Sequence, residues 1–379
     1  MAAVPDDQTP LLARIAARIR RRGPLRVDQF MAIALQDPEH GYYRRARPIG
    51  REGDFVTAPE ISQIFGELIG LWLGERWLAM GRPRPVRLLE LGPGRGTLMA
   101  DVWRACRVVP GFHEAATIHL VEINETLLAE QGKRLDNVTW HENIADVPSG
   151  PTLVIANEFF DAFPIRQFVR SHGRWQERAV GLADDGKRLC WTVVPAAESD
   201  LHVMAPASWL TTAAEGAVFE AAPAAAAYAE KVAERLAQDG GAALIIDYGY
   251  EGPAFGDSLQ AVFRHRFADP LARPGMQDLT AHVDFTILRR AAQAAGLAVF
   301  GPVPQGRFLL ELGLAVRLAR LVAGKPPAVA QILQTAAERL VAPDQMGALF
   351  KVMAWTTLAD TPPGFTTANA ESGGKETAS

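Results

Sequence analysis

The stretch Val86-Arg-Leu-Leu-Glu-Leu-Gly-Pro-Gly-Arg-Gly-Thr-Leu98 decides which folds this chain can adopt. Its first part is a largely apolar run typical of a buried parallel strand, and three glycines at every second position follow. From Thr97 to Val109 the apolar residues fall on one helical face. A glycine-rich turn between strand and helix exposes bare backbone, and the first turn of the helix offers unpaired N–H groups. The stretch therefore predicts a nucleotide-cofactor site, with a plain structural turn as the alternative.

The spacing of the glycines narrows the choice of cofactor. In the dinucleotide fingerprint the third glycine stands three residues after the second, whereas Gly94 and Gly96 are two apart. The pattern Glu-x-Gly-x-Gly-x-Gly is similar to the first motif of class I S-adenosylmethionine (SAM) methyltransferases, in which the loop approaches the amino acid end of the cofactor. We therefore expect SAM to be bound here by Glu90, Gly92, Pro93, Gly94, Gly96 and Thr97.

Apolar segments alternate with helical ones along the following part of the chain. We expect strands at 117–123, 138–141, 152–156 and 242–247, and a last strand at 350–356. Strands at such intervals, separated by helices, indicate an α/β fold with a doubly wound parallel sheet covered on both faces. In such sheets ligands bind beyond the carboxyl ends of the strands.

Acidic or amide residues follow each of the first five expected strands. Glu122 ends the second strand, where a carboxylate can accept both ribose hydroxyls, and Ile123 lies beside it. Asn143 and Ile144 follow the third strand and are placed to meet the adenine, the amide at its edge and the aliphatic group at its face. As an equal alternative, Asn143 caps the turn that follows.

The segment Asn157-Glu-Phe-Phe-Asp-Ala-Phe-Pro164 follows the fourth strand, beside the glycine loop in a doubly wound sheet. Glu158 and Asp161 would share a face if a helical turn began here, and the phenylalanines could exclude water. Two desolvated carboxylates could orient a guanidinium or amine, and one could accept its proton during methyl transfer. The alternative is that the phenylalanines belong to the core and Asp161 caps a helix.

Outside these strands the sequence predicts a mostly helical region at 1–85 and a core at 86–359 with insertions at about 165–240 and 256–345. Thr57 and Pro59 lie in a polar, loop-rich arm, where they serve either a site or the cap of the next helix. The basic face of the first helix resembles an organelle presequence, but its start and stop signals favour a docked helix. We expect residues 360–379, rich in Pro, Gly, Thr and Ser, to be disordered.

Composition excludes several classes of function. The net charge of -4 and the pI near 6.1 argue against a nucleic-acid partner. Two cysteines cannot build a disulfide framework or a Cys-rich zinc site, which favours a reducing compartment. His265 and His282 have no accompanying ligand cluster, so we expect structural histidines and no metal. No apolar run approaches the roughly eighteen residues that span a bilayer.

Taken in order, these segments resemble one family, the MidA-like methyltransferases, which include the mitochondrial complex I assembly-factor arginine methyltransferase and many bacterial relatives. The resemblance runs from about Phe30 to Trp355. It rests on Gly41-Tyr-Tyr43, Gly53-Asp-Phe-Val-Thr-Ala-Pro-Glu60, Glu90-Leu-Gly-Pro-Gly-Arg-Gly-Thr97, Asn157-Glu-Phe-Phe-Asp-Ala162, Ile246-Asp-Tyr-Gly249, Asp278-Leu-Thr-Ala-His-Val-Asp284 and Gly347-Ala-Leu-Phe-Lys351.

The resemblance implies a seven-stranded class I methyltransferase fold, SAM as methyl donor, and catalytic roles for Asn157, Glu158 and Asp161. It also implies that the arm with Thr57 and Pro59 covers the cofactor. The expected substrate is an arginine of a protein of the type of a respiratory complex I subunit. The expected location is the bacterial cytoplasm, or the mitochondrial matrix in a eukaryote. Three alternatives remain: a small-molecule methyltransferase, a dinucleotide oxidoreductase and a non-catalytic assembly chaperone.

Overall fold

The computed structural model describes residues 9–44, 57–252 and 254–366. Among these residues, eight strands form one large sheet, in the order β15-β16-β10-β5-β2-β3-β4 with β14 beside β10. Its strands are β2 (Val86–Leu91), β3 (Ala116–Val121), β4 (Val138–His141), β5 (Thr152–Asn157), β10 (Gly241–Tyr250), β14 (Val283–Asp284), β15 (Ala298–Pro304) and β16 (Phe350–Thr356). The carboxyl ends of β2, β3, β5 and β10 meet at one edge because these strands are parallel.

The strand pattern predicted from the sequence is confirmed, and β4 and β16 have the expected bounds. The sheet is nevertheless mixed, because β16 runs antiparallel to both β10 and β15. β15 was not predicted. Its residues are only partly buried and its register shifts between Phe300 and Val303, around Gly301-Pro302, so the strand has no continuous apolar run.

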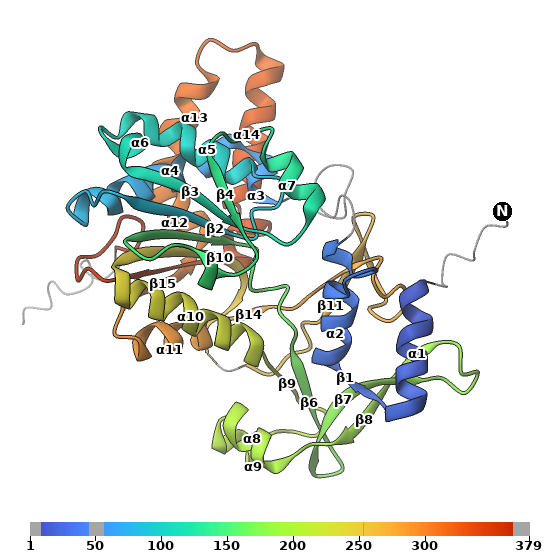
Figure 1. Ribbon diagram of the computed structural model, residues 1–379. Coiled ribbons are helices and arrows are strands. Elements are labelled where there is room, and N and C mark those ends of the chain that lie inside the picture. The colour runs from blue at the N-terminus through green and yellow to red at the C-terminus, as the bar shows by residue number, and fades with distance from the viewer. Residues whose placement is uncertain (1–8, 45–56, 253, 367–379) are drawn as a thin grey trace, which may run out of the picture.

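Helices cover both faces of the large sheet, which lies between the two layers in Figure 1. One face packs against α4 (Gln63–Ala79), α5 (Thr97–Ala105) and α12 (Gln305–Glu311), and the other against α10 (Pro223–Asp239) and α11 (Phe285–Ala294). α4 is apolar nearly all round and buries Trp72 and Trp77. Gly66 and Gly70 bring α4 against α5, since a Cβ on Gly70 would lie 2.8 Å from the carbonyl oxygen of Val102. We call the sheet and its helices the core lobe.

A second lobe lies apart from the core lobe at the lower right of Figure 1. It contains α1 (Pro10–Arg22), β1 (Leu25–Arg26), α2 (Val27–Gln36), β6 (Arg166–Ser171), β7 (Arg174–Leu182), β8 (Leu189–Pro195), α8 (Glu198–Met204), α9 (Ala207–Thr212) and β9 (Val218–Ala221). The region 1–85 is therefore not one unit. β1 pairs with β7 and α1 and α2 bury their apolar faces here, whereas α3 (Ala58–Ile61) and α4 belong to the core lobe.

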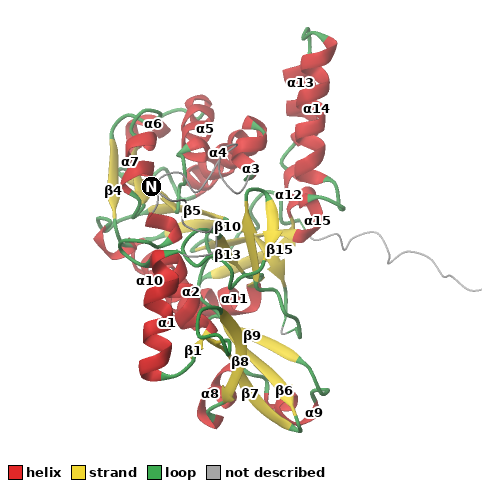
Figure 2. Cartoon of the chain, turned by 90° about the vertical axis from the view of Figure 1, so that its right-hand side faces the viewer, coloured by secondary structure: helices red, strands yellow, loops and turns green. Residues whose placement is uncertain are grey.

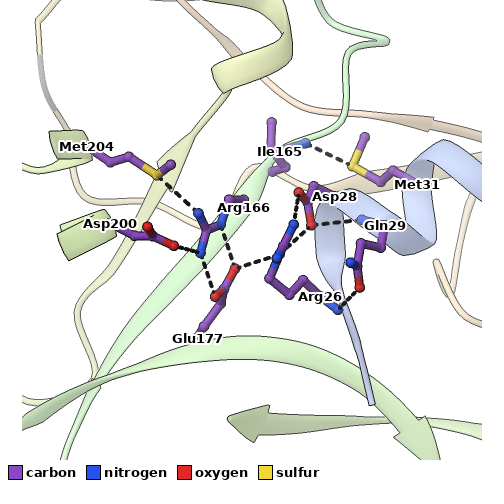
Figure 3. A network of polar contacts seen from close by, with 9 residues as sticks. All are labelled: Arg26, Asp28, Gln29, Met31, Ile165, Arg166, Glu177, Asp200 and Met204. Atoms are coloured by element: carbon purple, nitrogen blue, oxygen red, sulfur yellow. Dashed lines mark hydrogen bonds and ion pairs between the residues drawn. The ribbon is translucent and has the colours of Figure 1, made fainter. Parts of the chain in front are cut away.

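A buried polar network joins the helices and strands of the second lobe (Figure 3). The guanidinium of Arg166 donates to both carboxylate oxygens of Glu177, at 2.7 and 2.8 Å, and lies 2.7 Å from Asp200. Glu177 also lies 3.5 Å from Arg26, which pairs with Asp28 at the start of α2. The bidentate geometry links β6, β7, α8 and α2 through directional contacts.

The remaining elements are short or peripheral. They are the 3-10 turns Tyr42–Arg44, Cys106–Val108 and Ile144–Asp146, the helices α6 (Phe112–Ala115), α7 (Glu125–Gln131), α13 (Leu314–Val322), α14 (Pro327–Val341) and α15 (Met346–Leu349), and the small sheet β11 (Gln260–Phe263), β12 (Arg266–Ala268) and β13 (Asp278–Thr280). Figure 2 shows α13 and α14 projecting at the end of the molecule opposite the second lobe. None of the described helices is long and apolar enough to cross a membrane.

The expectation of a disordered tail from residue 360 is wrong for residues 360–366. Phe365 is buried against Phe308, and the carbonyl oxygen of Pro363 accepts the indole N–H of Trp72 at 3.1 Å. Asp360 pairs with the buried Arg76 at 2.9 Å. A single aromatic anchor and an ion pair thus compensate for the polar composition. Residues 367–379 lie outside the described part of the chain, as does the segment 45–56 of the predicted arm.

Candidate active site

The glycine loop connects β2 to α5 with its backbone in the left-handed region. Gly92, Gly94 and Gly96 have φ values of 61°, 53° and 77°, and Gly96 caps α5. A Cβ on Gly92 would lie 2.9 Å from the ring of Phe159, and one on Gly96 would lie 3.1 Å from Gln131. Glycine is therefore required at Gly92 and Gly96, both for the backbone conformation and because neighbouring side chains leave no room for a Cβ. The unpaired N–H groups at the start of α5 are suited to binding an anionic group.

Glu90, at the end of β2, is 3% exposed, and its Oε2 has no hydrogen-bond partner among the described residues. Burial raises the pKa of this carboxyl to about 8, while the backbone N–H of Met99 opposes the rise. An unpaired buried acceptor is costly unless a ligand or water completes it. Glu90 therefore fits a loop that receives a cationic or hydrogen-bonding cofactor.

Glu122 follows β3, and its carboxylate is held in place by its own loop. Oε1 accepts the backbone N–H groups of Ile123 and Asn124, each at 2.8 Å. Gln131 donates to Oε2 at 3.4 Å and to the carbonyl oxygen of Gly94 at 2.7 Å, which joins this carboxylate to the glycine loop. Sequence reasoning missed Gln131, because nothing in α7 marks it apart from its place on the buried face.

Asn143 and Ile144 occupy the turn after β4. The backbone N–H of Asn143 donates to Asp146 at 3.2 Å, and the exposed Asn143 precedes a 3-10 turn as its N-cap. Ile144 is 4% exposed and belongs to the core that faces α10. These contacts agree with the turn-capping alternative, and the adenine contact remains a prediction.

The end of the arm lies between the glycine loop and the segment after β5. Glu60 accepts the hydroxyl of Thr97 at 2.5 Å and pairs with Arg95 at 3.3 Å. Two residues earlier, the N–H of Ala58 donates to Oε1 of Glu158 at 3.4 Å. Thr57 is the N-cap of α3 and Pro59 is buried within it, whereas Ser62 caps α4 through its side chain. Glu60 is the last residue of the motif that begins at Gly53, but it was not assigned to the site from the sequence.

Glu158 has an unusual backbone for its residue type. Its φ is +50°, so no helical turn begins here, and its N–H donates to the carbonyl oxygen of Ile246 at 2.8 Å. Desolvation raises the pKa of its carboxyl to about 8, and the nearby Asp161 adds to the rise. The N–H of Ala58 and the amide of Asn157, 3.2 Å away, oppose it. A non-glycine residue in this region is a strained conformation of the kind often found at functional sites.

Asp247, at the end of β10, fixes the segment that carries these carboxylates. Its Oδ2 accepts the N–H groups of the three consecutive residues 159–161, at 3.2, 2.9 and 3.2 Å. Asp161 in turn accepts the hydroxyl of Tyr248 at 2.5 Å. Burial raises the pKa of Asp161 to about 6, although the Tyr248 hydroxyl opposes the rise. Burial and the charges of Asp161 and Glu158 also raise the pKa of Asp247.

The three carboxyl groups therefore occupy one poorly hydrated region in which ionisation is costly, and a bound cation would favour it. Asp247 and Tyr248 were recognised in the sequence only as polar residues at a strand end. Phe159 and Phe163 pack against Tyr228 of α10, and Phe160 is buried in the core. The core interpretation is confirmed for Phe160, and the exclusion of water by Phe159 and Phe163 stays a prediction.

His265 and His282 lie in different surroundings. His265 stands in the turn between β11 and β12, with φ +61°. The His282 ring meets the Tyr248 ring edge-on at 5.6 Å, and burial lowers its pKa. Within the described ranges, no group of three or more His, Cys, Asp or Glu side chains is arranged to hold a metal ion.

Comparisons with solved structures agree with the overall fold. The chain superposes on a crystal structure from Burkholderia thailandensis bound to S-adenosyl-homocysteine, with a TM-score of 0.78 and 28% identity over 96% of this chain and 97% of the other. A native structure from the same organism gives a TM-score of 0.80 with 29% identity over 97% and 98% of the two chains.

Sequence comparisons give the family. The mouse (Mus musculus) protein named Protein arginine methyltransferase NDUFAF7, mitochondrial, is 37% identical over 386 residues, which are 92% of this chain and 85% of that protein. The human (Homo sapiens) protein of that name is 34% identical, over 91% of this chain and 83% of its own length. Residues 68–303 match the model of the family described as "Putative S-adenosyl-L-methionine-dependent methyltransferase". The chain therefore belongs to this family of S-adenosyl-L-methionine-dependent methyltransferases, and SAM is its cofactor.

Proposed function

We propose that this SAM-dependent methyltransferase modifies an arginine side chain of a protein partner, of the type of a respiratory complex I subunit, and so aids the assembly of that partner. The names of the mouse and human relatives support arginine as the acceptor. The observation that carries the proposal is the pair of desolvated carboxyl groups of Glu158 and Asp161, both with a raised pKa. Neither forms an ion pair with a Lys or Arg in the described part of the chain, so the region can receive a guanidinium.

For the cofactor, we assign the amino acid end to Glu90 and the glycine loop with Gly92, Pro93, Gly94, Gly96 and Thr97. Glu122 and Ile123 would bind the ribose, Asn143 and Ile144 the adenine, and Thr57 and Pro59 would cover the site. The bare backbone of the loop and the unpaired Oε2 of Glu90 support this assignment. Bound SAM supplies a methyl group on a positively charged sulfur.

For the acceptor, Glu158 and Asp161 would hold the guanidinium in line with the methyl group, and Asn157 would orient the Glu158 carboxylate. Catalysis then comes mainly from positioning and from fixed negative charge in a region of low hydration. One of the two carboxylates accepts the proton that the guanidinium loses. Asp247 keeps both in place by binding three backbone N–H groups of their segment.

The variant Glu158→Gln tests this assignment, because it keeps the size of the side chain and removes its charge. We expect methyl transfer to be abolished, measured as labelled methyl groups in arginine of proteins from a strain lacking the gene. Affinity for S-adenosylhomocysteine, measured by calorimetry, should stay within a few-fold of the wild type. If methyl transfer and affinity for S-adenosylhomocysteine fell equally, Glu158 would instead belong to the cofactor site. Labelled methyl groups in residues other than arginine would refute the proposed acceptor.

We also propose that the protein works in the bacterial cytoplasm, or in the mitochondrial matrix if its source is eukaryotic. The named relatives are mitochondrial, and both cysteines, Cys106 and Cys190, are free thiols, which agrees with a reducing compartment.

A further inference from the structure

Two adjoining cavities open between the core lobe and the second lobe, each of about 420 Å³. They share Glu220, Tyr250 and His282 in their walls, and we call the two together the interlobe cleft. The first turns of α10 and α11 form one side of it, and β9 and the end of α8 form the other. A cavity of this size can receive one or two side chains of a bound segment.

The walls of the cleft are unbalanced in charge. They contain the carboxyl groups of Glu220, Glu230, Asp257 and Asp284, and Arg290 is the one Lys or Arg among the described lining residues. Burial raises the pKa values of Glu220 and Asp284 and lowers that of His282. Within the described part of the chain Glu220 and Asp284 form no ion pair, although the charge of Arg290 opposes the rise in the pKa of Asp284. A bound cation would stabilise the ionised forms of both carboxyl groups.

These carboxylates are also fixed in direction. Glu220 accepts the amide of Gln167 at 2.7 Å and the N–H of Ser258 at 3.0 Å, and Asp284 accepts the N–H of Thr286 at 2.8 Å. These donors are uncharged, so they fix the positions of the carboxylate oxygens without offsetting their negative charge. Of the other two, Asp257 pairs with Arg178 at 2.6 Å, whereas Glu230 is exposed and forms no ion pair within the described part of the chain.

One wall of the cleft is in contact with the side chain that binds Asp161. Its wall residue His282 meets the ring of Tyr248, whose hydroxyl donates to Asp161 at 2.5 Å. The residue before it, Ala281, donates its N–H to the carbonyl oxygen of Asp161 at 3.0 Å. The rings of Tyr248 and His282 lie along this route, so a segment with one side chain beside Asp161 would have its neighbouring residues near the cleft.

We propose that the interlobe cleft binds the segment flanking the methylated arginine, and that its carboxylates bind a second basic side chain of that segment. The inference rests on the proposed function and adds to it a specificity for acceptors with two neighbouring positive charges. Long-range attraction by the acidic walls would also assist encounter with such a segment. A small-molecule acceptor would have no need of the cleft.

Two matched pairs of variants on α10 test the proposal. Ala227 and Glu230 line the cleft, whereas Ala224 and Glu234 are equally exposed on the same helix and do not. We therefore compare Ala227→Trp with Ala224→Trp, and Glu230→Lys with Glu234→Lys. The assay supplies labelled SAM and an extract of a strain lacking the gene, at protein concentrations well below saturation, and counts methylarginine.

We expect Ala227→Trp and Glu230→Lys to lower methylarginine formation about tenfold, with the loss recovering as the extract is concentrated. Both control variants should match the wild type, and all four should bind S-adenosylhomocysteine with unchanged affinity. If the wild type makes methylarginine and the cleft variants equal their controls, the cleft is not the acceptor site while the proposed function stands. If the wild type makes no methylarginine, the proposed function is refuted and the cleft assignment with it.

Discussion

Replacing Asn157 by Leu tests whether Glu158 must be ionised for methyl transfer. The amide of Asn157 donates to Glu158 at 3.2 Å, and this bond lowers the pKa of a carboxyl that desolvation has raised to about 8. Leucine has a similar volume and no donor. It also removes the Asn157 Oδ1, which is buried and has no hydrogen-bond partner among the described residues. The change therefore acts mainly on the charge state of Glu158.

The expected magnitude follows from the pKa. A carboxyl with a pKa of about 8 is ionised in only about one molecule in ten at pH 7, and each further unit lowers this fraction about tenfold. A hydrogen bond to a charged group contributes about 1.5–3 kcal/mol, which corresponds to a rise of about 1–2 pKa units when it is lost. At pH 7 the variant should therefore have a kcat/KM about tenfold to a hundredfold lower than the wild type.

The assay is the pH dependence of kcat/KM for methylarginine formation between pH 6 and 9.5, which reports the ionisation of the free enzyme. The wild type should gain activity with rising pH and level off above about pH 8, near the pKa of Glu158. In Asn157→Leu the rise should occur at higher pH, so that the two enzymes converge in alkaline buffer. A loss of the same size at every pH would refute the reasoning, because it would indicate damage to structure rather than a shifted ionisation.

Two further predictions concern stability. The pKa of the Glu158 carboxyl is 4.5 ordinarily and about 8 in the folded protein, so the stability it contributes is present below pH 4.5 and is lost as the pH rises to 8. Glu158→Gln should therefore unfold at a higher temperature than the wild type at pH 8 but not at pH 4.5. Equal differences between the two unfolding temperatures at both pH values, measured by calorimetry, would contradict this. In Gly70→Ala the new Cβ would lie 2.8 Å from the carbonyl oxygen of Val102 and 3.0 Å from the Cβ of Ala105. We expect this crowding to lower the free energy of unfolding, measured in urea, by about 1–3 kcal/mol, reduced by the higher helix propensity of alanine. As a control, Leu71→Ala at an exposed position of the same helix should have a smaller effect.

The sequence was sufficient for the parts of the fold that have a local signal. The glycine loop and the strand ends at Glu122 and Asn157 follow from patterns within ten or twenty residues, and the structure has them in those places. In the second lobe the first helix has such signals at both ends, but the pairing of the strands around it has none. β1 is two residues long and pairs with Ala179 and Val180, more than 150 positions away, so no local pattern could assign it.

The site was predicted incompletely for a similar reason. The continuous apolar run at 242–246 predicts a strand that ends at Asp247 and Tyr248, whereas β10 extends to Tyr250. The run also does not tell which backbone groups the side chains of these residues meet. The contacts of Asp247 with residues 159–161 depend on the positive φ of Glu158, which the sequence does not indicate for a glutamate. Likewise, Gln131 and Glu60 form hydrogen bonds with partners 37 residues away, Gly94 and Thr97.

The route of the chain between the two lobes has a consequence for how the protein can be divided. The first helices lie in the second lobe before α4 enters the core lobe, and the chain leaves again after β5 and returns at α10. No single cut releases either half with its own strands intact, so fragments made for expression, crystallisation or domain exchange will each contain an orphaned piece of the other. We therefore expect the two lobes to evolve as one unit and to be degraded as one unit, and they should be engineered together.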